Sequence, residues 1–120
     1  MLKTMGIETT FESSDTEASA HFLLPADLIW FQGHFPKQPL LPGVTQLQWV
    51  MDVAQKWLGP LHLDEIVSCK FIHPILPEKK LELRLTKQES GNSLLLHYEY
   101  RILTSNGKSP ASLGKLRCSK

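Results

Sequence analysis

GVTQLQWVMDVAQKWL, residues 43–58, is the one long stretch of this sequence whose apolar positions recur at steps of three and four. These positions are Val44, Leu47, Met51, Ala54 and Leu58. Such spacing stacks side chains along one face of an α-helix, so a helix of about four turns is predicted here. Val50, Val53 and Trp57 widen the apolar surface beyond a narrow stripe, which indicates a central helix wrapped by other structure.

Both ends of the predicted helix carry the expected boundary residues. Pro42 suits the first turn, where no hydrogen-bond donor is missed, and Gly59 suits a left-handed cap at the C-terminal end. Pro60 prevents continuation of the helix. The sequence therefore predicts that the helix begins at Gly43 and ends at Leu58.

Strand patterns lie on both sides of this helix. Alternating apolar and polar residues predict strands at 17–24, 66–72, 81–86, 93–103 and 111–118. Residues 77–80 are interpreted as a turn, and Asn106-Gly107 is a dipeptide favoured in tight hairpin loops. One helix against a largely antiparallel sheet predicts an α+β fold, and 120 residues predict a single domain over 1–120.

Composition narrows the class of protein. The chain is 42% hydrophobic and 21% charged, as in soluble globular proteins, and its formal net charge of +1 argues against a nucleic-acid partner. Cys69 and Cys118 lack a CxxC spacing and are expected to be buried free thiols. We expect no metal, no membrane span and no signal peptide, and therefore a cytoplasmic protein.

The segment WFQGHFPKQPLLPGV, residues 30–44, departs from these periodic patterns. Its three prolines and two glycines restrict the backbone, so His34 is held in a defined direction before a ligand arrives. The segment leads directly into the N-terminus of the predicted helix, whose first amides have no intrahelical partners and whose dipole favours negative charge. An oxyanion could be stabilised there.

The pattern GHFPxxPxxPGV followed by a helix resembles the motif of the β-hydroxyacyl-acyl-carrier-protein dehydratases of the hot-dog fold. It covers residues 31–44, and residues 69–77 resemble the strand and turn that follow in that family. The resemblance implies one central helix wrapped by a curved antiparallel sheet, subunits that pair edge to edge, and active sites formed across the dimer interface. The short chain and one substitution on the helix resemble the small dehydratases of aryl-polyene synthesis.

The resemblance also implies roles for individual residues. His34 matches the histidine that removes the α-proton of a 3-hydroxyacyl thioester, which suits a neutral imidazole. The amides of Gly43 and Val44 match the donors that polarise the thioester carbonyl, and Phe35 and Pro36 are expected to contact substrate. No cofactor is required, because the thioester itself accepts the developing charge.

The sequence departs from the family at the second catalytic position. The family has a carboxylate on the helix where this chain has Gln48, and an amide one turn later where this chain has Asp52. Thr45, Gln48, Asp52 and Gln55 share one face at steps of three and four. One turn is about 5.4 Å, so Asp52 could replace the missing acid only through water or with a shifted substrate. Both residues stay candidates for the second catalytic role.

The expected activity is dehydration of 3-hydroxyacyl thioesters on the phosphopantetheine of an acyl carrier protein to trans-2-enoyl thioesters, in fatty-acid-like or polyene-type synthesis. We expect a homodimer or a heteromer with another hot-dog subunit. Two alternatives remain: a non-catalytic partner subunit of a dehydratase, favoured by Gln48, and an acyl thioesterase, favoured by Asp52. The remaining histidines and the tryptophans are interpreted as structural: His21, His62, His73, His97, Trp30, Trp49 and Trp57.

Overall fold

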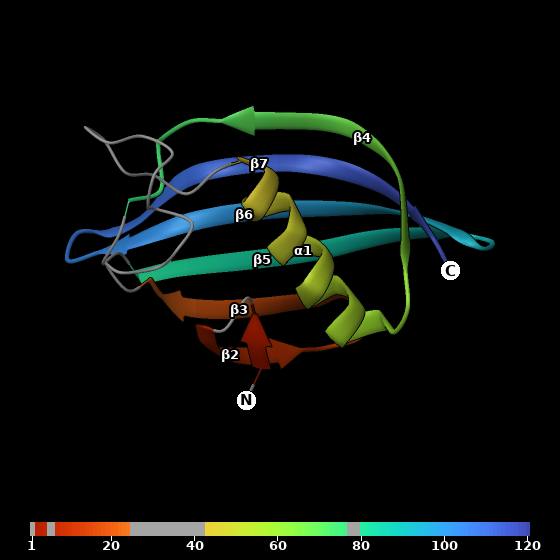
Figure 1. Ribbon diagram of the computed structural model, residues 1–120, viewed down its shortest axis with the longest axis horizontal. Helices are drawn as coiled ribbons and strands as arrows, with labels where there is room; N and C mark the ends of the chain where they lie inside the picture. Colours follow the sequence, from red (N-terminus) through yellow and green to blue (C-terminus); the bar gives the residue numbers. More distant parts are fainter. Residues whose placement is uncertain (1, 5–6, 25–42, 77–79) are drawn as a thin grey trace.

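The computed structural model describes residues 2–4, 7–24, 43–76 and 80–120. Its strands are β1 (Leu2–Thr4), β2 (Ile7–Ser13), β3 (Glu17–Leu23), β4 (His62–Phe71), β5 (Lys80–Ser90), β6 (Ser93–Thr104) and β7 (Gly107–Ser119). They form one antiparallel sheet in the order β1-β2-β3-β5-β6-β7-β4. The helix α1 (Gly43–Leu58) crosses the inner face of this sheet, which curves around it (Figure 1).

The path of the chain explains the strand order. After α1 the chain runs back to the far edge of the sheet, where β4 pairs with β7, and then returns to the centre as β5 (Figure 1). Hairpins join β5 to β6 and β6 to β7. The predicted α+β fold, with one helix wrapped by a curved antiparallel sheet, is confirmed. No described helix has both the length and the apolar character needed to cross a bilayer.

The core lies between α1 and the sheet. Leu81, Leu83 and Leu85 alternate along β5 and are fully buried, as a strand with one covered face requires. Trp49 of α1 is also fully buried and stacks on Phe22 of β3, with ring centroids 5.5 Å apart. Burial of such large aromatic side chains contributes strongly to the hydrophobic stabilisation of a small protein.

The helix begins and ends at the predicted residues. Gly59 follows α1 with a φ of 84°, and its amide donates a hydrogen bond to the carbonyl of Gln55 at 2.9 Å. A side chain would be strained at this φ, so glycine provides the predicted left-handed cap.

The buried face of α1 differs from the predicted stripe. It consists of Thr45, Gln46, Trp49, Val50, Met51, Val53 and Ala54. Val44 was expected in the core and is 78% exposed. The prediction was wrong because Trp49, Val50 and Val53 face the sheet, and Val44 then points away from it. Leu47 and Leu58 are only partly buried.

The predicted strands are present and mostly longer than predicted. β4 starts at His62 instead of residue 66, and β5 continues to Ser90. The turn predicted at 77–80 lies outside the described residues except for Lys80, which is the first residue of β5. β1 and β2 were not predicted, because β1 is only three residues long and β2 is rich in threonine, serine and glutamate.

The strand β4 is the long edge of the sheet, and all ten of its residues are exposed. Cys69 on this strand is therefore exposed, contrary to the prediction, whereas Cys118 on β7, which is paired on both sides by β4 and β6, is buried. The sulfur of Cys69 lies 3.2 Å from the hydroxyl of Tyr98. An edge with open backbone groups is a natural place for another chain to pair.

Candidate active site

The first turn of α1 is where the proposed substrate-binding backbone lies. Gly43 is half-buried at the first position of the helix. A Cβ atom at this position would lie 2.7 Å from Cζ of Phe71, a residue of β4. Only glycine therefore fits between the helix start and the aromatic ring as they stand. Val44, beside it, presents its side chain to the outside.

Several predicted site residues fall outside the described part of the chain. They are His34, Phe35 and Pro36. The segment that carries them ends at residue 42, directly before Gly43. Chain continuity therefore connects the predicted base to the N-terminus of α1, and the roles of these three residues stay predictions.

Gln48 and Asp52 are brought together by the helix. The Nε2 amide of Gln48 donates a hydrogen bond to Oδ1 of Asp52 at 3.0 Å. Gln48 is exposed and Asp52 is half-buried. The two candidates for the second catalytic role thus form one hydrogen-bonded pair, in which Asp52 accepts. The polar face predicted at steps of three and four is not uniform, because Thr45 is buried and Gln55 is exposed.

The negative charge of Asp52 also affects the pKa of Tyr100 on β6. Burial raises the pKa of Tyr100 well above its ordinary value, and the charges of Tyr98 and Asp52 raise it further. Tyr100 therefore stays protonated in any physiological range and acts as a hydrogen-bond donor. Its hydroxyl donates to the backbone carbonyl of Gln46 at 2.5 Å.

Gln46 is a functional candidate that the sequence reasoning missed. Its side-chain oxygen accepts a hydrogen bond from the hydroxyl of Ser112 at 2.7 Å, and both residues are buried. A signal for it was present: Gln46 precedes Trp49, Val50 and Val53 by three, four and seven residues, which places a polar group on the most apolar face of the helix. Buried polar groups are kept in native proteins only with partners.

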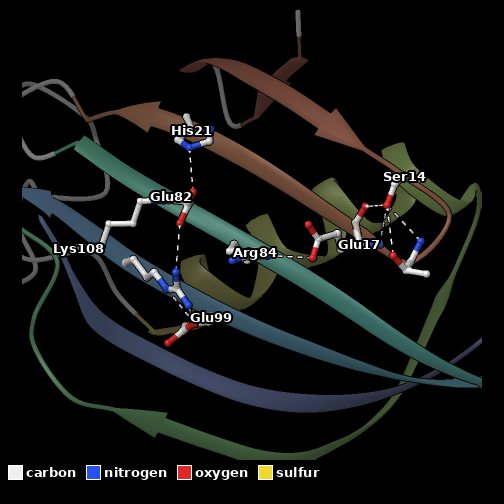
Figure 2. Close-up of polar contacts among 9 residues, drawn as sticks. Ser14, Glu17, His21, Glu82, Arg84, Glu99 and Lys108 are labelled. Carbon is white, nitrogen blue, oxygen red and sulfur yellow. Dashed lines mark hydrogen bonds and ion pairs between the residues drawn. The ribbon is translucent and has the colours of Figure 1, made fainter.

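A second polar cluster lies on the outer face of the sheet, away from α1 (Figure 2). Glu82 is 4% exposed, and its Oε2 lies 3.0 Å from both Nε2 of His21 and Nζ of Lys108. Burial raises the pKa of Glu82, but the hydrogen bonds and charges of Lys108 and His21 outweigh it, so the pKa is lowered overall. The other carboxylate oxygen of Glu82, Oε1, is buried without a hydrogen-bond partner among the described residues and lies 3.9 Å from Nη1 of Arg101.

The described side chains contain no group of three or more histidine, cysteine, aspartate or glutamate residues placed as metal ligands. His21 forms an ion pair with Glu82, in line with the structural role predicted for it. Trp49 packs in the core, and Nε1 of Trp57 donates to the carbonyl of Ser14 at 2.9 Å, while Trp30 lies outside the described residues.

Comparisons with known proteins agree with this architecture. A family model described as ApeI-like, ApeI dehydratase, matches residues 10–112. A chain of the dehydratase heterocomplex ApeI:P from Xenorhabdus doucetiae is 35% identical, with a TM-score of 0.83 over 95% of this chain and 98% of that one. An uncharacterised protein from Erwinia carotovora is also 35% identical, with a TM-score of 0.78 over 94% of this chain and 95% of that one.

Curated relatives are also dehydratases, and they match a smaller part of the chain. The 3-hydroxyacyl-[acyl-carrier-protein] dehydratase FabZ of Allorhizobium ampelinum is 30% identical over 81 residues, which are 60% of this chain and 53% of the relative. The chain thus spans about half the length of the curated relatives it matches. The match to the family model covers most of the sequence and includes all of α1 and β3–β6. The chain belongs to the ApeI-like dehydratase family of the hot-dog fold.

Proposed function

We propose that this protein dehydrates 3-hydroxyacyl thioesters carried on an acyl carrier protein, giving trans-2-enoyl thioesters. The observation that carries the proposal is the junction of the GHFPxxPxxPGV motif with the N-terminus of α1, at Gly43. The likeness to a chain of a dehydratase heterocomplex over nearly its whole length supports it. We place the reaction in fatty-acid-like or polyene-type synthesis, with aryl-polyene synthesis as the favoured setting.

The mechanism assigns the first step to His34. Its neutral imidazole removes the α-proton, and the amides of Gly43 and Val44 stabilise the charge that develops on the thioester oxygen. The electrons of the broken C–H bond then form the double bond, and the β-hydroxyl leaves with a proton as water. The free amides of a helix N-terminus suit the step in which charge develops on the thioester oxygen, because they already point in one direction before the reaction starts.

Gln48 and Asp52 supply the second role in one of two ways. In the favoured one, the imidazolium of His34 returns the proton to the departing hydroxyl, and Gln48 hydrogen-bonds that hydroxyl with its second N–H group. The bond from Gln48 to Asp52 supports this, because it orients the amide and leaves that N–H available. In the other, Asp52 donates a proton through a water held by Gln48.

The β4 edge is the proposed contact with a second hot-dog subunit. Leu63, Ile66, Val67 and Phe71 are exposed along it. An antiparallel pair of such edges would cover these side chains and complete the open backbone hydrogen bonds. It would also bring the acidic residues 64–65 of one strand towards the basic Lys70 of the other. The partner is a second copy of this chain or a related subunit, as in the complex from Xenorhabdus doucetiae, described as a heterocomplex.

A non-catalytic partner subunit is the second candidate, since Gln48 replaces the carboxylate and the similar chain belongs to a heterocomplex. Hot-dog acyl-CoA hydrolases are also similar in fold, but at 16% identity they support no activity. The test is incubation of the purified protein with a 3-hydroxyacyl carrier protein, followed by mass spectrometry. Dehydration predicts loss of water, hydrolysis predicts free acid, and a partner subunit predicts neither.

The matched control is His34→Ala. Removal of a general base should lower the dehydration rate by at least ~10²-fold while the variant stays folded. Undiminished dehydration by this variant would reject the assignment of His34.

A further inference from the structure

Three side chains from three neighbouring strands contact the first turns of α1. Tyr100 of β6 and Ser112 of β7 are register partners, and Ser112 is also the register partner of Phe71 on β4. The three residues therefore form one row across the sheet, here called the anchoring row. It lies under the start of the helix, where the proposed substrate-binding amides are found.

Each member of the anchoring row contacts a different group of the helix. The Tyr100 hydroxyl donates to the carbonyl of Gln46, and the Ser112 hydroxyl donates to the side-chain oxygen of the same residue. The Phe71 ring fills the space next to Gly43 that a Cβ would need. The row thus fixes the helix start by two hydrogen bonds and one close packing contact.

A local irregularity of the sheet lies directly beside the anchoring row. The register between β6 and β7 shifts next to Tyr100, where Arg101 pairs with Pro110 and Ala111 is left as the extra residue. Ala111 and Ser112 are both buried, although neighbouring strand residues normally face opposite sides. The carbonyl of Ala111 accepts the amides of Ile72 at 2.8 Å and His73 at 3.0 Å. Ser112 keeps the inward alternation of Gly114, Leu116 and Cys118 along β7, so the bulge turns Ala111 inward next to it.

Burying the hydroxyls of Tyr100 and Ser112 costs desolvation free energy, which apolar side chains would not cost. Tyr100 and Ser112 are fully buried in a sheet face that is otherwise mostly apolar. Apolar side chains would fill the same space without the need for paired donors. Directional hydrogen bonds, however, fix the position of a helix to within a few tenths of an ångström, as a preorganised site needs.

We propose that the anchoring row, Tyr100, Ser112 and Phe71 with its acceptor residue Gln46, positions the first turn of α1 so that the amides of Gly43 and Val44 meet the thioester oxygen. These are positioning residues, because they act through the helix. This inference rests on the proposed dehydration, and it adds residues from three strands that the sequence motif does not contain.

The test compares two tyrosines that differ in what their hydroxyls hold. Tyr98 and Tyr100 lie on the same face of β6. Tyr100→Phe removes a hydroxyl that is hydrogen-bonded to the helix, and Tyr98→Phe removes a hydroxyl that contacts Cys69. The assembled protein is used for steady-state kinetics with a 3-hydroxyacyl carrier protein. We expect kcat to fall about tenfold in Tyr100→Phe with KM unchanged, and to stay within about twofold of wild type in Tyr98→Phe.

Amide hydrogen exchange provides a readout that does not depend on activity. The amides of Leu47 and Gln48 close the first helical turns, and we expect them to exchange at least about tenfold faster in Tyr100→Phe and in Ser112→Ala, but not in Tyr98→Phe. Amides near Val53 should stay protected in all three variants.

The outcomes separate the two proposals. Faster exchange at 47–48 together with a lower kcat supports the positioning role. Exchange that matches Tyr98→Phe, or an unchanged kcat despite faster exchange, overturns it. A wild-type protein without dehydratase activity rejects the proposed function, and the exchange data then decide alone whether the row holds the helix start.

Discussion

The two ends of α1 are held in different ways. At the C-terminal end, Gly59 has a φ of 84° and caps the carbonyl of Gln55 four residues earlier, and this local cap is joined by one tertiary hydrogen bond, from Nε1 of Trp57 to the carbonyl of Ser14. At the N-terminal end, the contacts come from β4, β6 and β7, far along the chain. The end nearest the proposed chemistry is thus held by side chains of three strands, whereas the other end has a backbone cap of its own. Substitutions there should change turnover, and substitutions elsewhere should change only stability.

Gly43→Ala should have the largest effect. The added Cβ would meet Cζ of Phe71 at 2.7 Å, so the ring or the helix start has to move. A displacement of about 1 Å in a catalytic group can cost ~10²-fold, and because the 55% exposed ring of Phe71 can take up part of the shift, we expect a loss of up to that size in the dehydration rate. Gly43→Ala combined with Phe71→Leu should recover part of the rate, because leucine is shorter. Full turnover by the single variant would contradict the close fit at this end.

Glu82→Gln tests the outer face, which is not connected to α1. The amide cannot neutralise the charge of Lys108, so the folded state should lose about 2 kcal/mol at neutral pH with no change in turnover. Chemical denaturation and a dehydration assay measure the two quantities. A drop in turnover without a drop in stability would show that the two faces are coupled.

The same residue predicts a pH dependence. Because the pKa of Glu82 is lowered from its ordinary 4.5 on folding, its stabilising contribution is complete above that value and is lost as pH falls through the folded pKa. Denaturation of wild type from pH 6 down to about pH 3 should therefore show a steeper loss of stability than in Glu82→Gln. Parallel curves would mean that the carboxyl gains no stabilisation on folding.

Asp52→Asn separates the two mechanisms proposed for Gln48 and Asp52. If Gln48 only hydrogen-bonds the leaving hydroxyl, this variant should lose less than about tenfold, and Gln48→Glu should be tolerated or faster since it restores an acid. Single-turnover rates of folded, assembled variants make the comparison. A near-inactive Asp52→Asn beside an unaffected Gln48→Ala would favour proton donation by Asp52.

Gly59→Ala should have the smallest effect and no effect on turnover. An alanine at a φ of 84° is strained, which costs about 1 kcal/mol of folding stability. Thermal denaturation measures this loss. If dehydration fell more than stability, the two ends of the helix would not differ as proposed.

The sequence predicted the features that depend on neighbours in the chain. The bounds of α1, the cap at Gly59 and the alternation along β5 follow from periodicity and backbone preference. It did not predict the exposure of Val44 and Cys69, which depends on how the helix is rotated and on which strand forms the edge. Those properties arise only when distant segments pack together.

The candidate site divides in the same way. The motif identified Gly43 and the pair Gln48 and Asp52 as candidates, and the structure shows the hydrogen bond between the latter two. Tyr100 and Ser112 were missed, because their role depends on the pairing of β6 with β7 and on which groups of α1 pack over these strands. Periodicity along one strand cannot reveal which group of a distant helix a side chain meets.

The most direct test of the central claim is where a substrate analogue binds. Isotope-labelled protein, in its assembled state, is titrated with a pantetheine 3-hydroxyacyl amide, in which an unreactive amide replaces the thioester, and amide chemical shifts are followed. We predict that, within α1, the amide chemical shifts of Gly43 and Val44 change most, because these amides donate to the carbonyl oxygen of the analogue. Saturating shifts elsewhere, with Gly43 and Val44 unmoved, would contradict the account.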